Sequence, residues 1–197
     1  MVTSLKEEVT DLCYIGEAEG ENQTFVTVGW DKNIHIWPDS KEEVIEAMKV
    51  LPQDGQQTHA DDITQVCFAK KDNLLFTGAY DGSVIAWNYE TGYMKSQLHE
   101  LDPSMLALPD RLDLKSVECL IVLEKRARIS DDKEFVQGFL LSGTADQNIR
   151  IFQTWNLQFT KMFNVSHGRF DDLSCLSATE DCEILFTGDT AGNVRRH

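Results

Sequence analysis

The side chains best suited to chemistry gather at His59, which is followed closely by Asp61 and Asp62. A histidine beside carboxylates can bind a metal ion or act in general acid–base catalysis. Two consecutive aspartates are also typical of a solvated loop. The sequence has no glycine-rich phosphate loop, nucleophile elbow or metal-binding spacing elsewhere. Whether His59 belongs to a metal or acid–base site or to a solvated loop therefore depends on the secondary structure around it.

The five cysteines are an odd number without paired spacing, which argues against a disulfide framework and against a zinc site. Four of them follow the first apolar residue of four similar segments, Cys13 and Cys67 by four positions and Cys119 and Cys175 by two. Even offsets place side chains on the same face of a β-strand. We expect these four thiols to share one buried face as small hydrophobic groups.

The chain is acidic, with a formal net charge of −15. This charge argues against a nucleic-acid-binding surface and against adhesion to an anionic membrane. No run of ~18 apolar residues is available to span a bilayer, and the first segment lacks the basic-then-apolar order of a signal peptide. We therefore expect a cytoplasmic protein, and its hydrophobic content of 42% is sufficient for a packed core.

One hairpin pattern recurs four times. Each copy has a short apolar run, a turn rich in Gly, Asp or Asn, and a second extended run. The copies span residues 25–37, 74–87, 139–152 and 184–197. In the second copy the turn is predicted at 78–82. β-branched residues and turn residues without a 3.6-residue period favour strands, and four copies predict a repeat protein.

A segment of pattern apolar-x-x-apolar-x-apolar precedes each hairpin and predicts one more strand per unit. The units run from about 8 to 58, 59 to 100, 101 to 166 and 167 to 197. Fourth strands are predicted at 93–98 and 159–165. Residues 42–51 fit a short amphipathic helix or a fourth strand, and the repeat favours the strand. The third unit has two insertions, 101–115 and 124–137, that we expect to be loops.

The units resemble WD40 repeats, which have a histidine before the first strand, Gly-x-x-Asp in the middle hairpin and Trp at the end of the third strand. In such repeats a His, a Ser or Thr, an Asp and a Trp form a hydrogen-bonded tetrad. The second unit matches at His59, Thr77, Asp81 and Trp87. A buried indole N–H needs an acceptor, and a hydroxyl can both accept and donate. The resemblance therefore implies that His59 is structural.

The other units match this tetrad in part. The matching residues are Thr27, Asp31 and Trp37 in the first unit, Ser142 and Asp146 in the third, and His167 and Thr187 in the fourth. The first unit lacks the histidine, the third has Phe152 in place of Trp, and the fourth has Ala191 in place of Asp.

The resemblance implies an all-β fold, a WD40 β-propeller of four-stranded antiparallel blades. The propeller is expected to be incomplete, with three blades and part of a fourth. The rest of the propeller or a neighbouring chain would then complete the ring. Until it does, Val and Leu side chains should be exposed on the outer faces of the first and last blades.

The function implied is a non-catalytic scaffold that binds other proteins, without cofactor or metal. The turn Val-Gly-Trp-Asp at 28–31 and the opening His-x-Asp-Asp-Ile at 59–63 resemble WD-repeat proteins of ciliary and flagellar axonemes. A cytosolic adaptor, such as a substrate receptor for a ubiquitin ligase, is the alternative. A propeller enzyme would need polar groups that converge on the central channel.

Partner contacts are expected in the two insertions, because loops on a rigid frame are free to specialise. The first insertion contains an apolar group that packs over the blade edge or anchors a partner: Met105, Leu106 and Leu108. The second contains a basic group that fits a solvated loop or a site for an acidic partner: Lys125, Arg126 and Arg128.

Overall fold

Fourteen strands form four antiparallel sheets in the computed structural model, which describes residues 7–16, 24–38, 58–98, 116–130, 133–165 and 172–197. No helix occurs among these residues, and hence none that could cross a membrane. The expected all-β fold is confirmed. Each sheet is a meander in which strands consecutive in the chain pair with each other.

The strands of the first two sheets follow the predicted hairpins. The first sheet contains β1 (Val9–Ile15), β2 (Thr24–Gly29) and β3 (Ile34–Pro38). The second contains β4 (Ile63–Ala69), β5 (Leu74–Ala79), β6 (Val84–Asn88) and β7 (Met94–Leu98). The alternative of strand or helix at 42–51 lies outside the described residues.

The last two sheets contain the longest and the shortest strands. The third sheet contains β8 (Val117–Ser130), β9 (Lys133–Thr144), β10 (Asn148–Gln153) and β11 (Phe159–Asn164). The fourth contains β12 (Leu173–Ala178), β13 (Leu185–Asp189) and β14 (Val194–Arg196). The fourth strands expected in the second and third units are thus present as β7 and β11.

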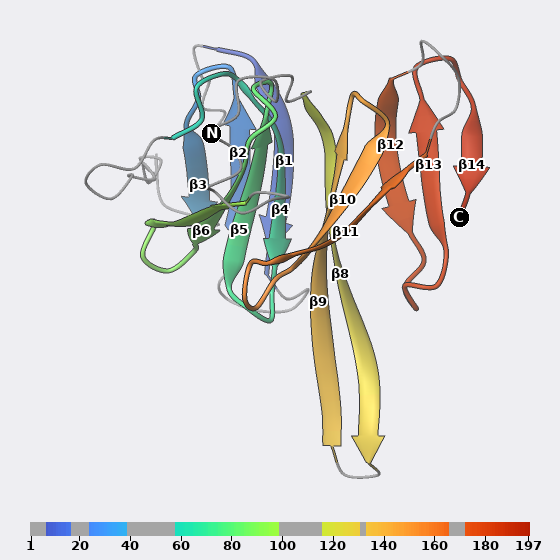
Figure 1. The fold of residues 1–197 in the computed structure, drawn as a ribbon. Coiled ribbons are helices and arrows are strands. Elements are labelled where there is room, and N and C mark those ends of the chain that lie inside the picture. Colours follow the sequence, from blue (N-terminus) through green and yellow to red (C-terminus); the bar gives the residue numbers. More distant parts are fainter. Residues whose placement is uncertain (1–6, 17–23, 39–57, 99–115, 131–132, 166–171) are drawn as a thin grey trace.

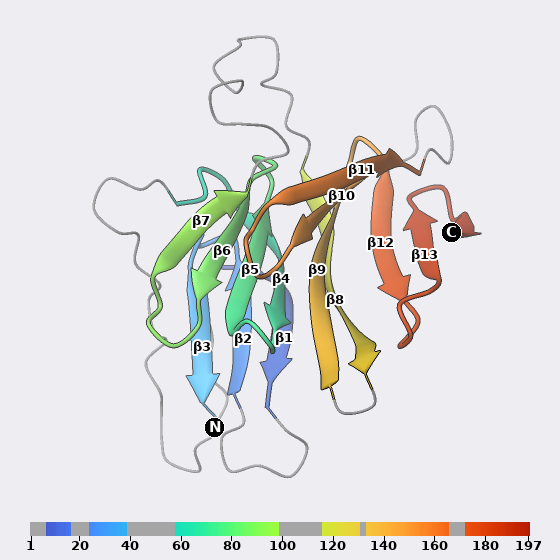
Figure 2. The same ribbon diagram turned by 60° about the horizontal axis from the view of Figure 1, so that its bottom comes forward.

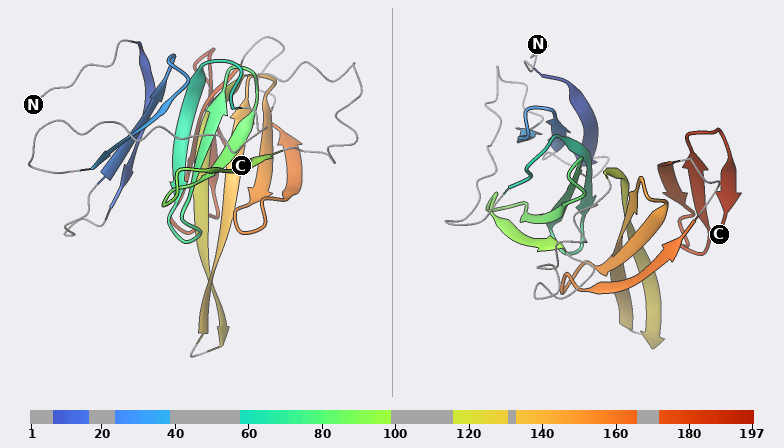
Figure 3. Two further views of the ribbon diagram at one scale, coloured as in Figure 1. Left: turned by 90° about the vertical axis from the view of Figure 1, so that its left-hand side faces the viewer. Right: turned by 45° about the horizontal axis from the view of Figure 1, so that its top comes forward.

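The four sheets stand side by side in chain order, as blades of a propeller do (Figures 1 and 3). Three apolar clusters fill the spaces between consecutive sheets. Every residue of β5 is buried, because its sheet is covered on both faces. Phe76 packs toward the third sheet, whereas Leu75 and Trp87 pack toward the first.

Threonines in the first strands also tie neighbouring sheets together. The Thr10 hydroxyl donates to the Ile63 carbonyl at 2.6 Å, and the Thr64 hydroxyl donates to the Val117 carbonyl at 2.6 Å. Both threonines sit at a register shift of their strand, where the ladder leaves room for the contact. The same polar link is therefore repeated at two successive interfaces.

The glycine at position 78 differs from its predicted role. Gly78 belongs to β5, and the turn begins after Ala79, with Gly82 at a φ of +79°. A Cβ on Gly78 would lie 2.4 Å from a methyl carbon of Val117 in the third sheet. Close approach of two sheets requires this glycine, and the left-handed turn conformation requires the one at 82.

The expected loop at 124–137 is wrong. Strands β8 and β9 continue their pairing as far as Arg128 with Glu134 and Ser130 with Lys133. The result is a two-stranded ribbon that projects well beyond the other sheets (Figures 1 and 3). Figure 2 shows β8 and β9 paired side by side along this ribbon. The two strands satisfy each other's backbone groups, so the pairing continues although charged residues are poor strand formers. We call residues 124–137 the arm.

The four cysteines share one kind of face, as their even offsets predict. Cys13, Cys67 and Cys119 contact the apolar clusters that lie toward the following sheet. Cys175 is exposed, because no described sheet covers that face of β12. The expectation of burial thus fails at this fourth thiol.

The outer faces of the end sheets are apolar and exposed, as expected from the incomplete ring. The first sheet exposes Val9 and Leu12, and the fourth exposes Val194. Aromatic side chains accompany them, namely Tyr14, Phe25 and Phe186. The expected fold class, an incomplete propeller of WD40 type, agrees with this arrangement.

Candidate functional site

Hydrogen bonds join the tetrad residues of the second sheet. The Trp87 indole N–H donates to the Thr77 hydroxyl at 2.8 Å, and His59 Nε2 lies 2.6 Å from the same oxygen. The other ring nitrogen of His59 lies 2.5 Å from the hydroxyl of Ser83, a residue absent from the predicted set. Asp81 accepts the backbone N–H groups of Ser83 and Ala60, both at 2.8 Å. The carboxylate therefore joins the network through Ser83 and through backbone.

Burial lowers the pKa of His59 to about 4, and the nearby Asp81 only partly opposes this shift. The imidazole is thus neutral at physiological pH, as a buried hydrogen-bonded ring should be. Asp61 and Asp62 are not among the side chains that contact the His59 ring. No group of three or more possible metal ligands occurs in the described part of the chain. The contacts of His59 with Thr77 and Ser83 tie the segment before β4 to β5 and to the turn that follows it.

The first sheet has a histidine contact that the repeat pattern does not predict. His35 on β3 lies with its Nε2 2.5 Å from the Asp31 carboxylate. Burial disfavours the charge on Asp31, but hydrogen bonds from His35 and Asn33 outweigh it and hold the pKa of Asp31 below its ordinary value. The Trp37 indole donates to the Thr27 hydroxyl at 2.9 Å. In this sheet the histidine that contacts the turn aspartate thus comes from β3, whereas in the second sheet the histidine precedes the first strand.

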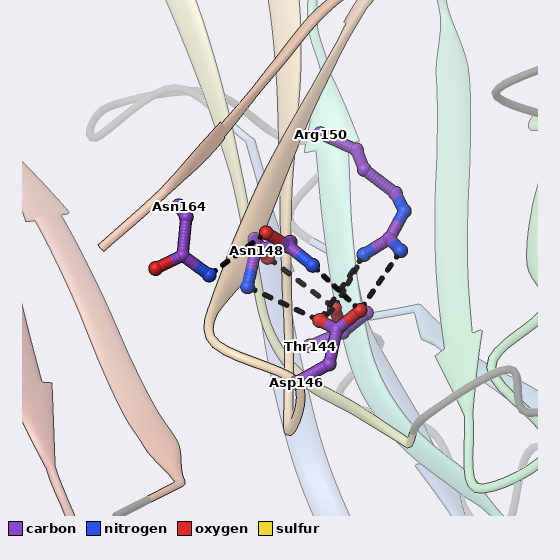
Figure 4. A network of polar contacts seen from close by, with 5 residues as sticks. All are labelled: Thr144, Asp146, Asn148, Arg150 and Asn164. Atoms are coloured by element: carbon purple, nitrogen blue, oxygen red, sulfur yellow. Dashed lines mark hydrogen bonds and ion pairs between the residues drawn. The ribbon is translucent and has the colours of Figure 1, made fainter. Parts of the chain in front are cut away.

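In the third sheet an arginine stands at the position that His35 has in the first sheet, four residues after the turn aspartate (Figure 4). Arg150 on β10 contacts Asp146 at 3.1 Å and also donates to the Thr144 hydroxyl. Burial again opposes the charge, yet Arg150, Thr144 and Asn148 together lower the pKa of Asp146 to about 2. Ser142, the predicted hydroxyl, is buried on the strand before the turn and has no hydrogen-bond partner within the described residues.

In the fourth sheet a histidine occupies the position of the tryptophan. His197 Nε2 lies 2.9 Å from the Thr187 hydroxyl, as the indole does in the second sheet. Asp189, two positions before Ala191, accepts the backbone N–H groups of the turn. His167 lies outside the described residues, as do Met105, Leu106 and Leu108. Arg126 and Arg128 are placed by their backbone only, in the arm.

The thiols of Cys13, Cys67 and Cys119, of which the last is buried and the others partly buried, are held in the protonated form. Burial, with smaller contributions from Cys175 and Glu118, raises the pKa of Cys119 to about 12, and burial also raises the pKa of Cys13 and Cys67. A protonated thiol is a poor nucleophile and a poor metal ligand. These cysteines pack the core.

An apolar groove lies between the third and fourth sheets, at the base of the arm. Its volume is about 410 Å³. Aliphatic and aromatic side chains of both sheets line it: Leu123, Phe139, Leu141, Ile151, Phe163, Ala178, Ile184 and Leu185. Trp87 fills the equivalent position between the first and second sheets, and Phe152 fills it between the second and third. Between the third and fourth sheets this position holds the smaller imidazole of His197, which leaves the groove open. An open apolar hollow of this size is a site for a ligand or a partner side chain.

Charged groups mark the rim of the groove. Lys125, the first cation of the arm, lies 3.5 Å from the Glu183 carboxylate across the groove. Lys161 of β11 is exposed and also lines the hollow. Two lysines at one apolar groove stand out in a chain of net charge −15. The sequence singled out Lys125, but no spacing in the sequence predicted that Lys125 and Lys161 would line the same groove.

The architecture defines a class before any sequence match is considered: successive antiparallel meanders, packed face to face, are the blades of a β-propeller. Residues 52–88, which include the first three strands of the second sheet, match the family model described as "WD domain, G-beta repeat". The match supports the WD40 assignment for this part of the chain. No curated protein sequence matches the chain.

Solved structures agree on the fold. The computationally designed Ika4 protein matches at 17% identity with a TM-score of 0.60, covering 100% of this chain and 94% of that one. The structure of U3-55K matches at 12% identity with a TM-score of 0.67, covering 98% of this chain. This chain spans 50% of U3-55K. At these identities the likeness concerns the fold alone.

Proposed function

We propose that the protein is a non-catalytic scaffold that binds other proteins, and that the groove between the third and fourth sheets is a principal contact. The observation that carries this proposal is the apolar hollow of about 410 Å³ with two lysines at its rim. The aspartates of the four hairpin turns, Asp31, Asp81, Asp146 and Asp189, accept backbone hydrogen bonds that fix those turns. WD40 repeats are in general used for protein contacts, which fits this assignment.

The groove suits a partner segment of a particular chemistry. Its walls are apolar, so they favour a leucine, phenylalanine or methionine side chain. Lys161 favours a carboxylate beside that anchor, because opposite charges at a rim guide approach and fix register. Lys125 already pairs with Glu183 of the same rim, and a partner carboxylate would compete for it. The partner segment is therefore an apolar one with a neighbouring acidic residue.

The arm extends the same surface. Lys125 and Gln137, which are cross-strand partners, lie at its base. A ribbon whose edges are free can pair with an extended segment of a partner through backbone hydrogen bonds. Groove and arm together form one continuous contact region.

As to cellular role, the protein is proposed to be a structural component of a ciliary or flagellar axonemal complex in the cytoplasm. The support is the resemblance of residues 28–31 and 59–63 to axonemal WD-repeat proteins. A cytosolic adaptor, such as a ubiquitin-ligase substrate receptor, is the second candidate. Imaging a tagged protein in ciliated cells separates them: signal along the axoneme supports the first, and diffuse cytosolic signal excludes it.

The groove is tested by filling it. Ala178→Phe should occupy the hollow, and Lys161→Glu should reverse its charge, while Tyr93→Glu on the exposed surface of the second sheet is the matched control. Cross-linking and quantitative mass spectrometry would compare the partners of all four proteins. The groove variants should lose a common set that the control retains. An identical set in all four, with folding intact, would exclude the groove.

A short arm completes the test. A two-residue Asn-Gly turn can join Lys125 to Gln137 directly, because these residues are cross-strand partners. Loss of the same partners supports one contact region made of groove and arm. If the short-arm variant keeps every partner that the groove variants lose, the arm is not part of the site.

A further inference from the structure

One end of each sheet is fixed by the same backbone hydrogen bond. The first residue of the turn between the second and third strands donates its N–H to the carbonyl of the residue just before the first strand, at 2.9–3.0 Å. The donors are Trp30, Tyr80, Ala145 and Thr190, and the acceptors are Glu8, Asp62, Ser116 and Asp172. These turns lie at the end of the sheets opposite the arm, which we call the turn end (Figure 1).

Two of the four turns carry a large aromatic side chain that the turn does not require. Trp30 is 46% exposed and Tyr80 is 53% exposed. Ala145 and Thr190 make the same backbone bond with small side chains, so neither ring is needed to form the turn. Tryptophan and tyrosine are the residues on which protein contacts most often depend. The two rings, on adjacent sheets, are therefore available to a partner.

The segment before β4 lies between the two aromatic turns. Lys32, in the turn of the first sheet, donates to the Ala60 carbonyl at 2.8 Å and lies 3.9 Å from the Asp61 carboxylate. The next residue, Asp62, accepts the backbone N–H of Tyr80 at 2.9 Å. The two carboxylates thus belong to one continuous surface that reaches from the first aromatic turn to the second.

The charges of this surface favour a cation. The ion pair of Asp61 with Lys32 is exposed on both sides and therefore weak. The Asp62 carboxylate takes part in no hydrogen bond or ion pair within the described residues. Glu8, whose carbonyl accepts the Trp30 N–H, is exposed as well. Three carboxylates against one lysine, in a chain of net charge −15, attract a basic group.

We propose that the turn end of the first two sheets binds a basic segment of a protein partner, with a lysine or arginine side chain held by Trp30, Tyr80 and Asp62. A cation over an aromatic face is attracted by the ring quadrupole, most strongly by that of tryptophan. The rings also contact the apolar stem of such a side chain, while the carboxylate pairs with its charged end. This surface and the groove have different residues and opposite charge preferences, so either site can fail without the other.

A titration of the wild-type chain locates the site. The probe is a peptide of alternating lysine and glycine, and the signals are the indole N–H resonances of the four tryptophans. The Trp30 resonance, assigned with Trp30→Leu, should shift on addition of peptide, whereas that of Trp155, exposed on the third sheet, should stay. The same peptide with acetylated lysines should shift neither. An unmoved Trp30 resonance, or equal shifts of both, would overturn the proposal.

Substitutions separate the site from the general attraction of an acidic chain. Trp30→Leu and Tyr80→Leu keep an apolar side chain but remove the aromatic face, and each should raise the Kd for the lysine peptide about twofold to fivefold. Tyr93→Leu, in the turn between β6 and β7, should leave the Kd unchanged. Asp62→Asn and Glu90→Gln, which is in that same turn, change the net charge equally, but only Asp62→Asn should weaken binding. Equal weakening by these two would mean that net charge alone attracts the peptide, and the site would be refuted.

Discussion

The two hydroxyls at equivalent positions of the second and third sheets should respond to removal in opposite ways. Thr77 accepts the Trp87 indole N–H at 2.8 Å and contacts His59 Nε2 at 2.6 Å. Ser142 is equally buried, but Phe152 stands in place of the tryptophan and supplies no N–H. The Ser142 hydroxyl has no partner among the described residues.

The magnitudes follow from what each substitution leaves unpaired. Thr77→Val keeps the shape of the side chain but orphans a buried indole N–H and a ring nitrogen. An orphaned buried polar group costs about 1–3 kcal/mol, so the free energy of unfolding should fall by about 2–4 kcal/mol, allowing for non-additivity. Ser142→Ala removes a buried hydroxyl that makes no hydrogen bond to the described residues. It should leave stability unchanged or raise it by up to ~1 kcal/mol.

Urea unfolding followed by tryptophan fluorescence and circular dichroism measures both changes. With an m-value of about 1–3 kcal/mol per M, the Thr77→Val midpoint should drop by about 1–2 M. Thr160→Val, at an exposed position of β11, controls for the generic effect of the substitution in a strand. If Ser142→Ala destabilises as much as Thr77→Val, the hydroxyl network is not what distinguishes the two sheets, and the reasoning fails.

Three further predictions concern the second sheet. Trp87→Ala should cost about 3–5 kcal/mol of unfolding free energy, since it empties a large buried volume; a melt unchanged from wild type would contradict the packing described. The pKa of His59 is about 4, against 6.5 unfolded, so the unfolded chain binds more protons between those values. The free energy of unfolding should therefore decrease as the pH is lowered from 6.5 to 4, by up to ~3 kcal/mol. His59→Asn should flatten this part of the stability–pH curve, and an equal slope in both proteins would refute the assignment. Thr64→Val should cost about 0.5–1.5 kcal/mol through its lost bond to Val117, and hydrogen exchange should rise at the interface of the second and third sheets but not at β3.

The sequence predicted what local pattern controls. Alternating residues and turn residues located the four hairpins, and even spacing placed the four first-strand cysteines on one kind of face. The exposed Val and Leu side chains of the end sheets follow from the same repeat. These features depend on a period of two and on a recurring unit, both of which are visible in a single chain.

The remaining features depend on contacts between elements, which periodicity does not report. Gly78 has the composition of a turn residue, but its role is to admit Val117 of another sheet. The arm was missed because its charges obscured a pairing that the backbone alone sustains. His35 and Arg150 each follow a turn aspartate by four positions, and this spacing was the available signal for the two ion pairs.

The order of the sheets bears on how the chain folds as it is synthesised. In the described structure every pairing within a sheet joins consecutive strands, so each sheet can form once its own residues have emerged. The Thr10 hydroxyl, however, meets a carbonyl 53 residues later. At ~5–20 residues per second, the first sheet waits about 3–10 s for its neighbour. During that interval Val26 and Val28, which the second sheet covers in the folded chain, face water.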